Sequence, residues 1–109
     1  MRVTCAQDSL NRALSIAGRA VASKSTLPIL GNVLLDAADD ALTISATNLE
    51  LGITVRVPGT VVEGGRITLQ ARVLSEFVSS LHPGDVELSQ DQGPLSVTVR
   101  QGQTQAHVR

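Results

Sequence analysis

The sequence is almost devoid of aromatic residues, with one Phe and neither Trp nor Tyr among 109 residues. A protein that binds single-stranded nucleic acid by base stacking needs several exposed aromatic faces, so this composition argues against such a platform. Cysteine is equally scarce, because Cys5 stands alone, which excludes an internal disulfide and a cysteine-pair metal site. We therefore expect Cys5 to be a buried or half-buried residue of an N-terminal strand rather than a reactive thiol.

Long hydrophobic runs and an excess of one charge are also missing. No apolar segment approaches the roughly 20 residues that cross a membrane, and residues 1–5 lack the apolar stretch of a secretory signal. The formal net charge of −1 does not by itself indicate a nucleic-acid partner. The hydrophobic fraction of 42% is ordinary for a globular protein, so we expect one cytoplasmic domain over residues 1–109, with no membrane contact.

Sequence patterns that mark common enzymes are absent as well. The chain contains neither a G-x-x-x-x-G-K-[ST] phosphate loop nor a G-x-G-x-x-G motif. Its two histidines, His82 and His107, have no Ser, Cys or carboxylate at motif spacing, and two ligands are too few for an ordinary zinc site. We expect no cofactor, no metal and no catalytic residue, and a small hydrolase or transferase is disfavoured because no nucleophile–base pair is present.

What the chain does contain is one order of elements that occurs twice. Hydrophobic patterning predicts helices over residues 8–21 and 71–81, each preceded by one strand and followed by three. The two halves are offset by about 64 residues, and they share the pattern but almost no identity. The predicted class is α+β, with two helices side by side on one face of antiparallel sheet. The expected strands are residues 1–6, 32–36, 41–46, 51–57, 66–69, 86–88, 95–100 and 104–109.

Each predicted helix has one apolar and one polar face. The apolar spacing predicts that Leu10, Leu14, Leu74 and Phe77 are buried against the sheet. Asp8 or Ser9 is expected to cap the first helix. At about 100° per residue, the outward residues of the two helices are Asp8, Arg12, Ser15, Arg19, Arg72, Ser75, Glu76 and Ser79.

Positive charge is concentrated in the first helix and the loop that follows it. Residues 8–24 carry Arg12, Arg19 and Lys24 against Asp8, a balance of +2. Residues 71–81 are neutral, and the remainder of the chain has a balance of −3. This distribution suits weak, sequence-independent contact with a phosphate backbone, although an ordinary solvated helix face would look the same.

Four segments resemble one family. Ser25–Leu35 (S-T-L-P-I-L-G-N-V-L-L) closely resembles the loop after the first helix of bacterial DNA sliding clamps. Leu42–Glu50 is similar to that family's threonine-x-leucine-glutamate strand end, Gln70–Arg72 to its entry into the second helix, and Val99–Gly102 to its last hairpin. These segments occur in the family's order and span nearly the whole chain.

The resemblance implies that the chain is the first of three clamp domains in the β subunit of DNA polymerase III. In that family, two subunits close head-to-tail into a homodimeric ring around double-stranded DNA and tether the polymerase, which gives processivity. The implied role is that of an accessory subunit. The pocket for the polymerase and the clamp loader would lie in the later two domains, which are absent here, so residues 1–109 would be an incomplete clamp. The alternative is a clamp-like oligomerising scaffold domain that does not encircle DNA.

The resemblance also places individual residues. Lys24 stands where the family often has a basic residue that contacts the DNA backbone, and Arg72 occupies a basic position of the second helix. With the outward Arg12 and Arg19, these residues form the expected DNA-binding set. Ala106 and Val108 align with the edge strand that meets the third domain of the partner subunit, where the family commonly has larger apolar residues.

Overall fold

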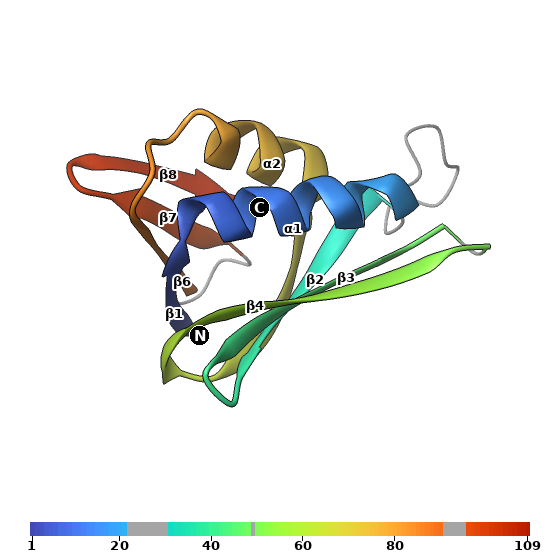
Figure 1. The fold of residues 1–109 in the computed structure, drawn as a ribbon, viewed down its shortest axis with the longest axis horizontal. Helices are drawn as coiled ribbons and strands as arrows, with labels where there is room; N and C mark the ends of the chain where they lie inside the picture. The colour runs from blue at the N-terminus through green and yellow to red at the C-terminus, as the bar shows by residue number, and fades with distance from the viewer. Residues whose placement is uncertain (22–30, 49, 91–95) are drawn as a thin grey trace.

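The computed structural model describes residues 1–21, 31–48, 50–90 and 96–109. In this part of the chain, eight strands form one sheet in the order β5-β2-β3-β4-β1-β6-β7-β8, with antiparallel neighbours. Both helices lie on the same side of the curved sheet (Figure 1). The elements are β1 Arg2–Ala6, α1 Gln7–Ala17, the 3-10 turn η1 Gly18–Ala20, β2 Asn32–Ala38, β3 Ala41–Thr47, β4 Gly52–Glu63, β5 Gly65–Gln70, α2 Ala71–Ser79, β6 Asp85–Gln90, β7 Val97–Gln101 and β8 Thr104–Val108.

The predicted repeat and fold class are confirmed. The order β1-α1-β2-β3-β4 is followed by β5-α2-β6-β7-β8, and α1 and α2 begin at Gln7 and Ala71, which is the expected offset of about 64 residues. Two of the expected boundaries are corrected. The first helix becomes a 3-10 turn after Ala17, and the second ends at Ser79 rather than at residue 81. Within the described residues, no helix is long and apolar enough to cross a bilayer.

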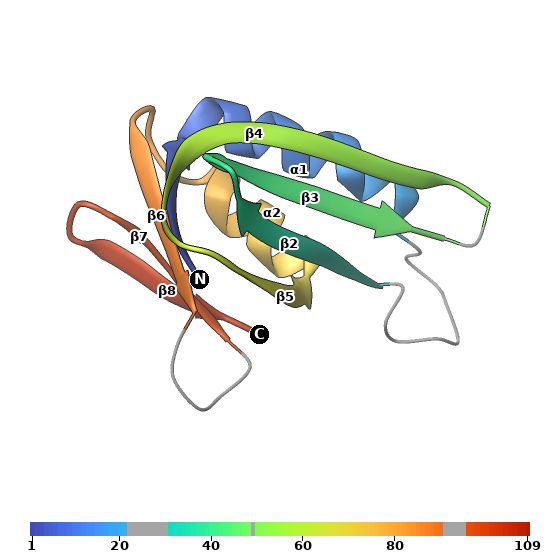
Figure 2. The same cartoon turned by 90° about the horizontal axis from the view of Figure 1, so that it is seen from below.

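The longest strand, β4, exceeds its predicted end at Val57 because it changes partners on the way. Its first part, residues 52–58, pairs with β3, and its second part, residues 59–63, pairs with β1. The strand curves at this point (Figure 2). Gly59 is required at the change of partner, because a Cβ there would lie 2.5 Å from the Thr4 carbonyl oxygen. Pro58 and Gly59, which in isolation indicate a strand end, therefore mark a switch between neighbours.

Burial follows the predicted helix faces with one exception. Leu10, Leu14 and Leu74 are buried in the core between the helices and the sheet, as expected. The prediction for Phe77 was wrong, because this side chain is only half-buried and packs at the margin of the core. Cys5 is buried in β1, as expected.

The predicted cap of the first helix is also corrected. The residue preceding α1 is Ala6, and no side chain caps the helix start. Asp8 lies inside the first turn, where its Oδ1 accepts a hydrogen bond from the Ser9 backbone N–H at 2.8 Å. A carboxylate at this position still stabilises the positive end of the helix dipole.

Candidate functional site

The outward face of α1 and η1 carries the two arginines that the sequence places there. Arg12 and Arg19 are exposed, as are Asp8 and Ser15. Seven residues correspond to two helical turns, or about 10 Å along the axis, so the two guanidinium groups form a row rather than a cluster. No ion pair joins either arginine to an acidic residue of the described part of the chain. Both groups are therefore available to an external anion.

The outward face of α2 carries a different arrangement. Arg72 Nε lies 3.4 Å from Glu76 Oε1, one helical turn away, and the two side chains are 88% and 72% exposed. Arg72 also occupies the first turn of α2, where the helix dipole disfavours a positive charge. The interaction with the helix dipole therefore does not explain why an arginine occupies position 72.

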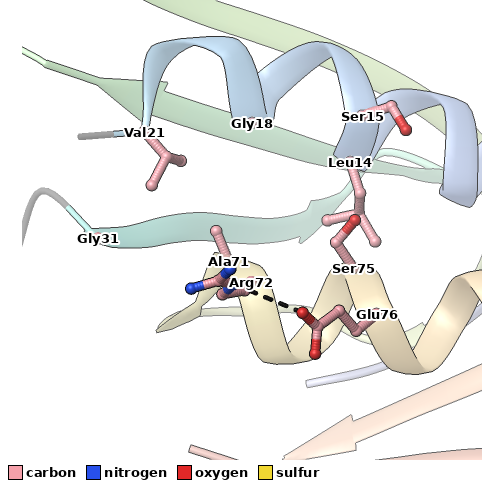
Figure 3. A pocket seen from close by; sticks show the side chains of 9 residues that line it. All are labelled: Leu14, Ser15, Gly18, Val21, Gly31, Ala71, Arg72, Ser75 and Glu76. Carbon is pink, nitrogen blue, oxygen red and sulfur yellow. Dashed lines mark ion pairs between the residues drawn. The ribbon is translucent and has the colours of Figure 1, made fainter. Parts of the chain in front are cut away.

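A groove of about 500 Å³ separates the two helices on this side of the molecule. Leu14 and Val21 from the α1 side face Ala71 across it, and Ser15, Ser75 and the Arg72–Glu76 pair supply polar groups (Figure 3). The C-terminal end of α1 therefore lies beside the start of α2, which carries Arg72. Lys24, the fourth predicted DNA-binding residue, lies outside the described residues.

The second predicted site, the last strand, is an edge of the sheet. Among the strands that the structure describes, β8 pairs with β7 alone. Beyond Val108, one backbone hydrogen bond of 3.0 Å joins Gln70 N–H to the Arg109 carbonyl oxygen. Ala106 is half-buried, whereas Val108 is 2% exposed and belongs to the core of this domain. The Val108 side chain is therefore not exposed to another chain.

An unpaired edge within the sheet, besides the terminal strands β5 and β8, was missed in the sequence. Residues 52–58 of β4 pair with β3 on one side, while β1 begins to pair with β4 only at Gly59. In the repeat, this part of β4 corresponds to β8, because each is the third strand after its helix. The doubled pattern was the signal that could have revealed it.

Two apolar residues at the surface of α2, Val73 and Phe77, were also missed. The corresponding residues of α1, Ser9 and Ala13, line a small hollow against residues 55–58 of β4. Their counterparts in α2, about 64 residues later, are Val73 and Phe77, and α2 contacts β8. Val73 is 44% exposed and Phe77 is half-buried. These apolar side chains thus lie at the surface of the helix that contacts β8.

The His and Cys side chains lie apart from one another in the described residues. No three His, Cys, Asp or Glu side chains come together there as a metal site. Burial, with the Asp85 carboxylate as a smaller cause, raises the pKa of the Cys5 thiol to about 12, which keeps it protonated and unreactive. The His107 ring Nδ1 lies 2.9 Å from Thr98 Oγ1 on the neighbouring strand, and His82 is exposed in the turn after α2.

Known proteins match both the sequence and the fold. The family model for the DNA polymerase III beta subunit, N-terminal domain, matches residues 1–107. A beta sliding clamp from Synechocystis sp. is 44% identical over 84% of this chain and 24% of its own length. One from Synechococcus elongatus is 39% identical over 96% of this chain and 29% of its own length.

The solved structures agree with the sequence relatives. The crystal structure of the DNA polymerase sliding clamp from Caulobacter crescentus superposes with a TM-score of 0.93 at 32% identity. The alignment covers 99% of this chain and 30% of that one. The chain thus spans between a quarter and a third of the length of these relatives.

Proposed function

The chain belongs to the family of the DNA polymerase III beta subunit, N-terminal domain, and from this premise we propose that it is the first domain of a bacterial sliding clamp. The proposed protein is a non-catalytic processivity factor that encircles double-stranded DNA and tethers the replicative polymerase. The observation that carries this proposal is the exposed face of the two adjacent helices, with arginines on a molecule of net negative charge.

The proposed DNA contact is electrostatic and independent of sequence. Arg12, Arg19 and Arg72 project from helices whose other outward residues are mostly short and polar, and Lys24 follows in the same basic segment. Long side chains can reach phosphate oxygens through or between waters, and such contacts carry no base information. A ring that slides needs contacts of this kind, because each one can be exchanged for the next at little cost.

Two of the unpaired strand edges support assembly into a ring. β8 and residues 52–58 of β4 each offer one row of backbone groups to a neighbouring strand. A domain with a single such edge would stop at one pairing, whereas two edges allow a neighbour on either side, as ring closure requires. We assign β8, the strand that carries Ala106 and Val108, together with Val73 and Phe77 of α2, to the contact with the partner subunit. The β4 edge would meet the next domain of the same subunit.

We further propose that residues 1–109 are part of a longer subunit with two more clamp domains. The support is that the chain covers 24% to 30% of the relatives that it matches. The polymerase and the clamp loader would bind through those later domains rather than through this one.

The decisive experiment loads the full-length subunit onto a closed circular duplex with its clamp loader and follows its retention before and after the circle is linearised. Retention on the circle and rapid loss from the linear form are expected of a ring that encircles DNA. A full-length protein that forms rings but stays on neither substrate would instead be the oligomerising scaffold.

A further inference from the structure

We propose that Glu76 competes with DNA phosphate for Arg72, so that the contact made by α2 is weaker and more readily exchanged than those made by α1. This inference rests on the proposed function, and it assigns to Glu76 a positioning role that acts through Arg72. The ion pair lies on the rim of the groove between the helices, beside Ser75 (Figure 3).

The geometry of the pair makes it a weak one. The Nε–Oε1 separation is 3.4 Å, and both side chains are largely exposed, so solvent screens the attraction. An exposed pair at i,i+4 shifts an equilibrium by about twofold, which is too little to keep Arg72 from a phosphate. The attraction is nevertheless sufficient for Arg72 to bind the Glu76 carboxylate again when a phosphate moves away. The guanidinium would thus alternate between the carboxylate and successive phosphates.

The corresponding positions of the first repeat lack this competition. Asp8 and Arg12 stand where Arg72 and Glu76 stand in the second repeat, with the charges reversed. No Asp8–Arg12 ion pair is present between these two described residues, and Asp8 Oδ1 accepts the Ser9 backbone N–H instead. Within the described residues, Arg12 of α1 and Arg19 of η1 have no ion-pair partner, whereas Arg72 of α2 has one. The two helices should differ in how strongly each holds a phosphate.

The test measures equilibrium binding of the full-length subunit to a short fluorescent duplex of mixed sequence over a series of salt concentrations. Glu76→Gln should tighten binding by about twofold and steepen the slope of log K against log salt by up to about 0.9. Arg72→Gln should flatten the slope, and Glu76→Gln should have no further effect when Arg72→Gln is already present. Glu50→Gln is the matched control, because it makes the same charge change at an exposed position outside both helices.

Three outcomes would overturn the inference. If Glu76→Gln tightens binding equally with or without Arg72, the carboxylate acts by general repulsion of DNA. If Glu50→Gln has the same effect, only net charge matters. If Glu76→Gln changes nothing while Arg12→Gln still weakens binding, the proposed function stands and the competition does not exist. Absence of DNA binding by the unaltered full-length protein would instead remove the proposed function itself.

Discussion

The side-chain amide of Gln7, the first residue of α1, donates a buried hydrogen bond of 2.9 Å to the carbonyl oxygen of Val78 near the end of α2. This contact joins residues that are 71 positions apart in the chain. The last carbonyls of a helix have no partner within the helix, so a donor from a neighbouring element stabilises its end. Gln7 also donates its backbone N–H to the Gly84 carbonyl oxygen at 2.8 Å, so one residue fastens the start of α1 to the segment that follows α2.

We expect Gln7→Leu to lower the free energy of unfolding of the 109-residue chain by about 0.5–1.5 kcal/mol. The Val78 carbonyl loses its buried side-chain donor but keeps the Leu81 backbone N–H at 3.2 Å, and the side-chain volume is retained. Urea unfolding followed by circular dichroism measures this loss. Gln101→Leu is the comparison, since its amide bridges the exposed His82 backbone and should matter less. Equal losses in both variants would contradict the importance of burial.

Truncation of Leu74 should cost more than truncation of Phe77, although phenylalanine is the larger residue. Leu74 is fully buried, so Leu74→Ala is expected to cost about 2–5 kcal/mol. Phe77 is only half-buried, so Phe77→Ala should fall below the usual range of about 3–5 kcal/mol for a buried Phe. Urea unfolding of both variants gives the order directly, and the reverse order would show that Phe77 is buried in solution.

The raised pKa of Cys5 predicts a loss of stability in alkali. The folded state holds the thiol protonated up to a pKa of about 12, whereas the unfolded chain ionises it at the ordinary value of 9.0. The contribution is therefore complete below pH 9.0 and is lost progressively as the pH rises to about 12. The unfolding midpoint in urea, measured across this interval, should fall more steeply for the unaltered chain than for Cys5→Ala.

Few other groups interfere with that measurement. The sequence has no Tyr and a single Lys, Lys24, so Cys5 is one of very few side chains that titrate between pH 9 and 12. Parallel curves for the unaltered chain and Cys5→Ala would show that the thiol is not held protonated by burial.

Substitution of the basic residues should weaken DNA binding equally on all sequences. We expect Lys24→Ala, and likewise Arg12→Gln or Arg19→Gln, to lower the salt slope of the full-length ring by roughly one unit each. Binding of the full-length subunit to several duplexes of unrelated sequence measures both properties. A loss confined to one sequence would indicate base contacts, which this face is not expected to make.

A proline at the outer side of β8 should disrupt subunit pairing while sparing the domain. Gln101 and Thr104 close a two-residue hairpin loop, so alternation along β8 directs the N–H groups of Thr104, Ala106 and Val108 to β7. The Gln105 N–H then points to the free edge. Gln105→Pro should shift the full-length dimer toward monomer in sedimentation, because it removes an interface donor.

The control variants separate pairing from folding. Gln105→Ala keeps the backbone donor and should leave the dimer intact. Val108→Pro, by contrast, removes a bond of the domain's own sheet and a buried side chain, so it should lower the unfolding midpoint as well. An unchanged dimer in Gln105→Pro would show that β8 is not the subunit interface.

Local patterning by itself determined most of the secondary structure. The repeat, the position of both helices and the burial of Leu10, Leu14 and Leu74 were predictable, because apolar spacing within one element depends only on neighbours in the chain. The outward orientation of Arg12, Arg19 and Arg72 follows from the same periodicity. The role of Lys24 remains a prediction, since it lies outside the described residues.

The tertiary structure decided how residues far apart in the chain meet. It extended β4 through Pro58 and Gly59, because β1 supplies a new partner where β3 ends. It left Phe77 half-buried at the margin of the core, and it turned Val108 into the core. Periodicity within a segment specifies which face is apolar, but burial also depends on what lies opposite that face. In this protein, pairings between strands far apart in the sequence determine which element lies opposite each face.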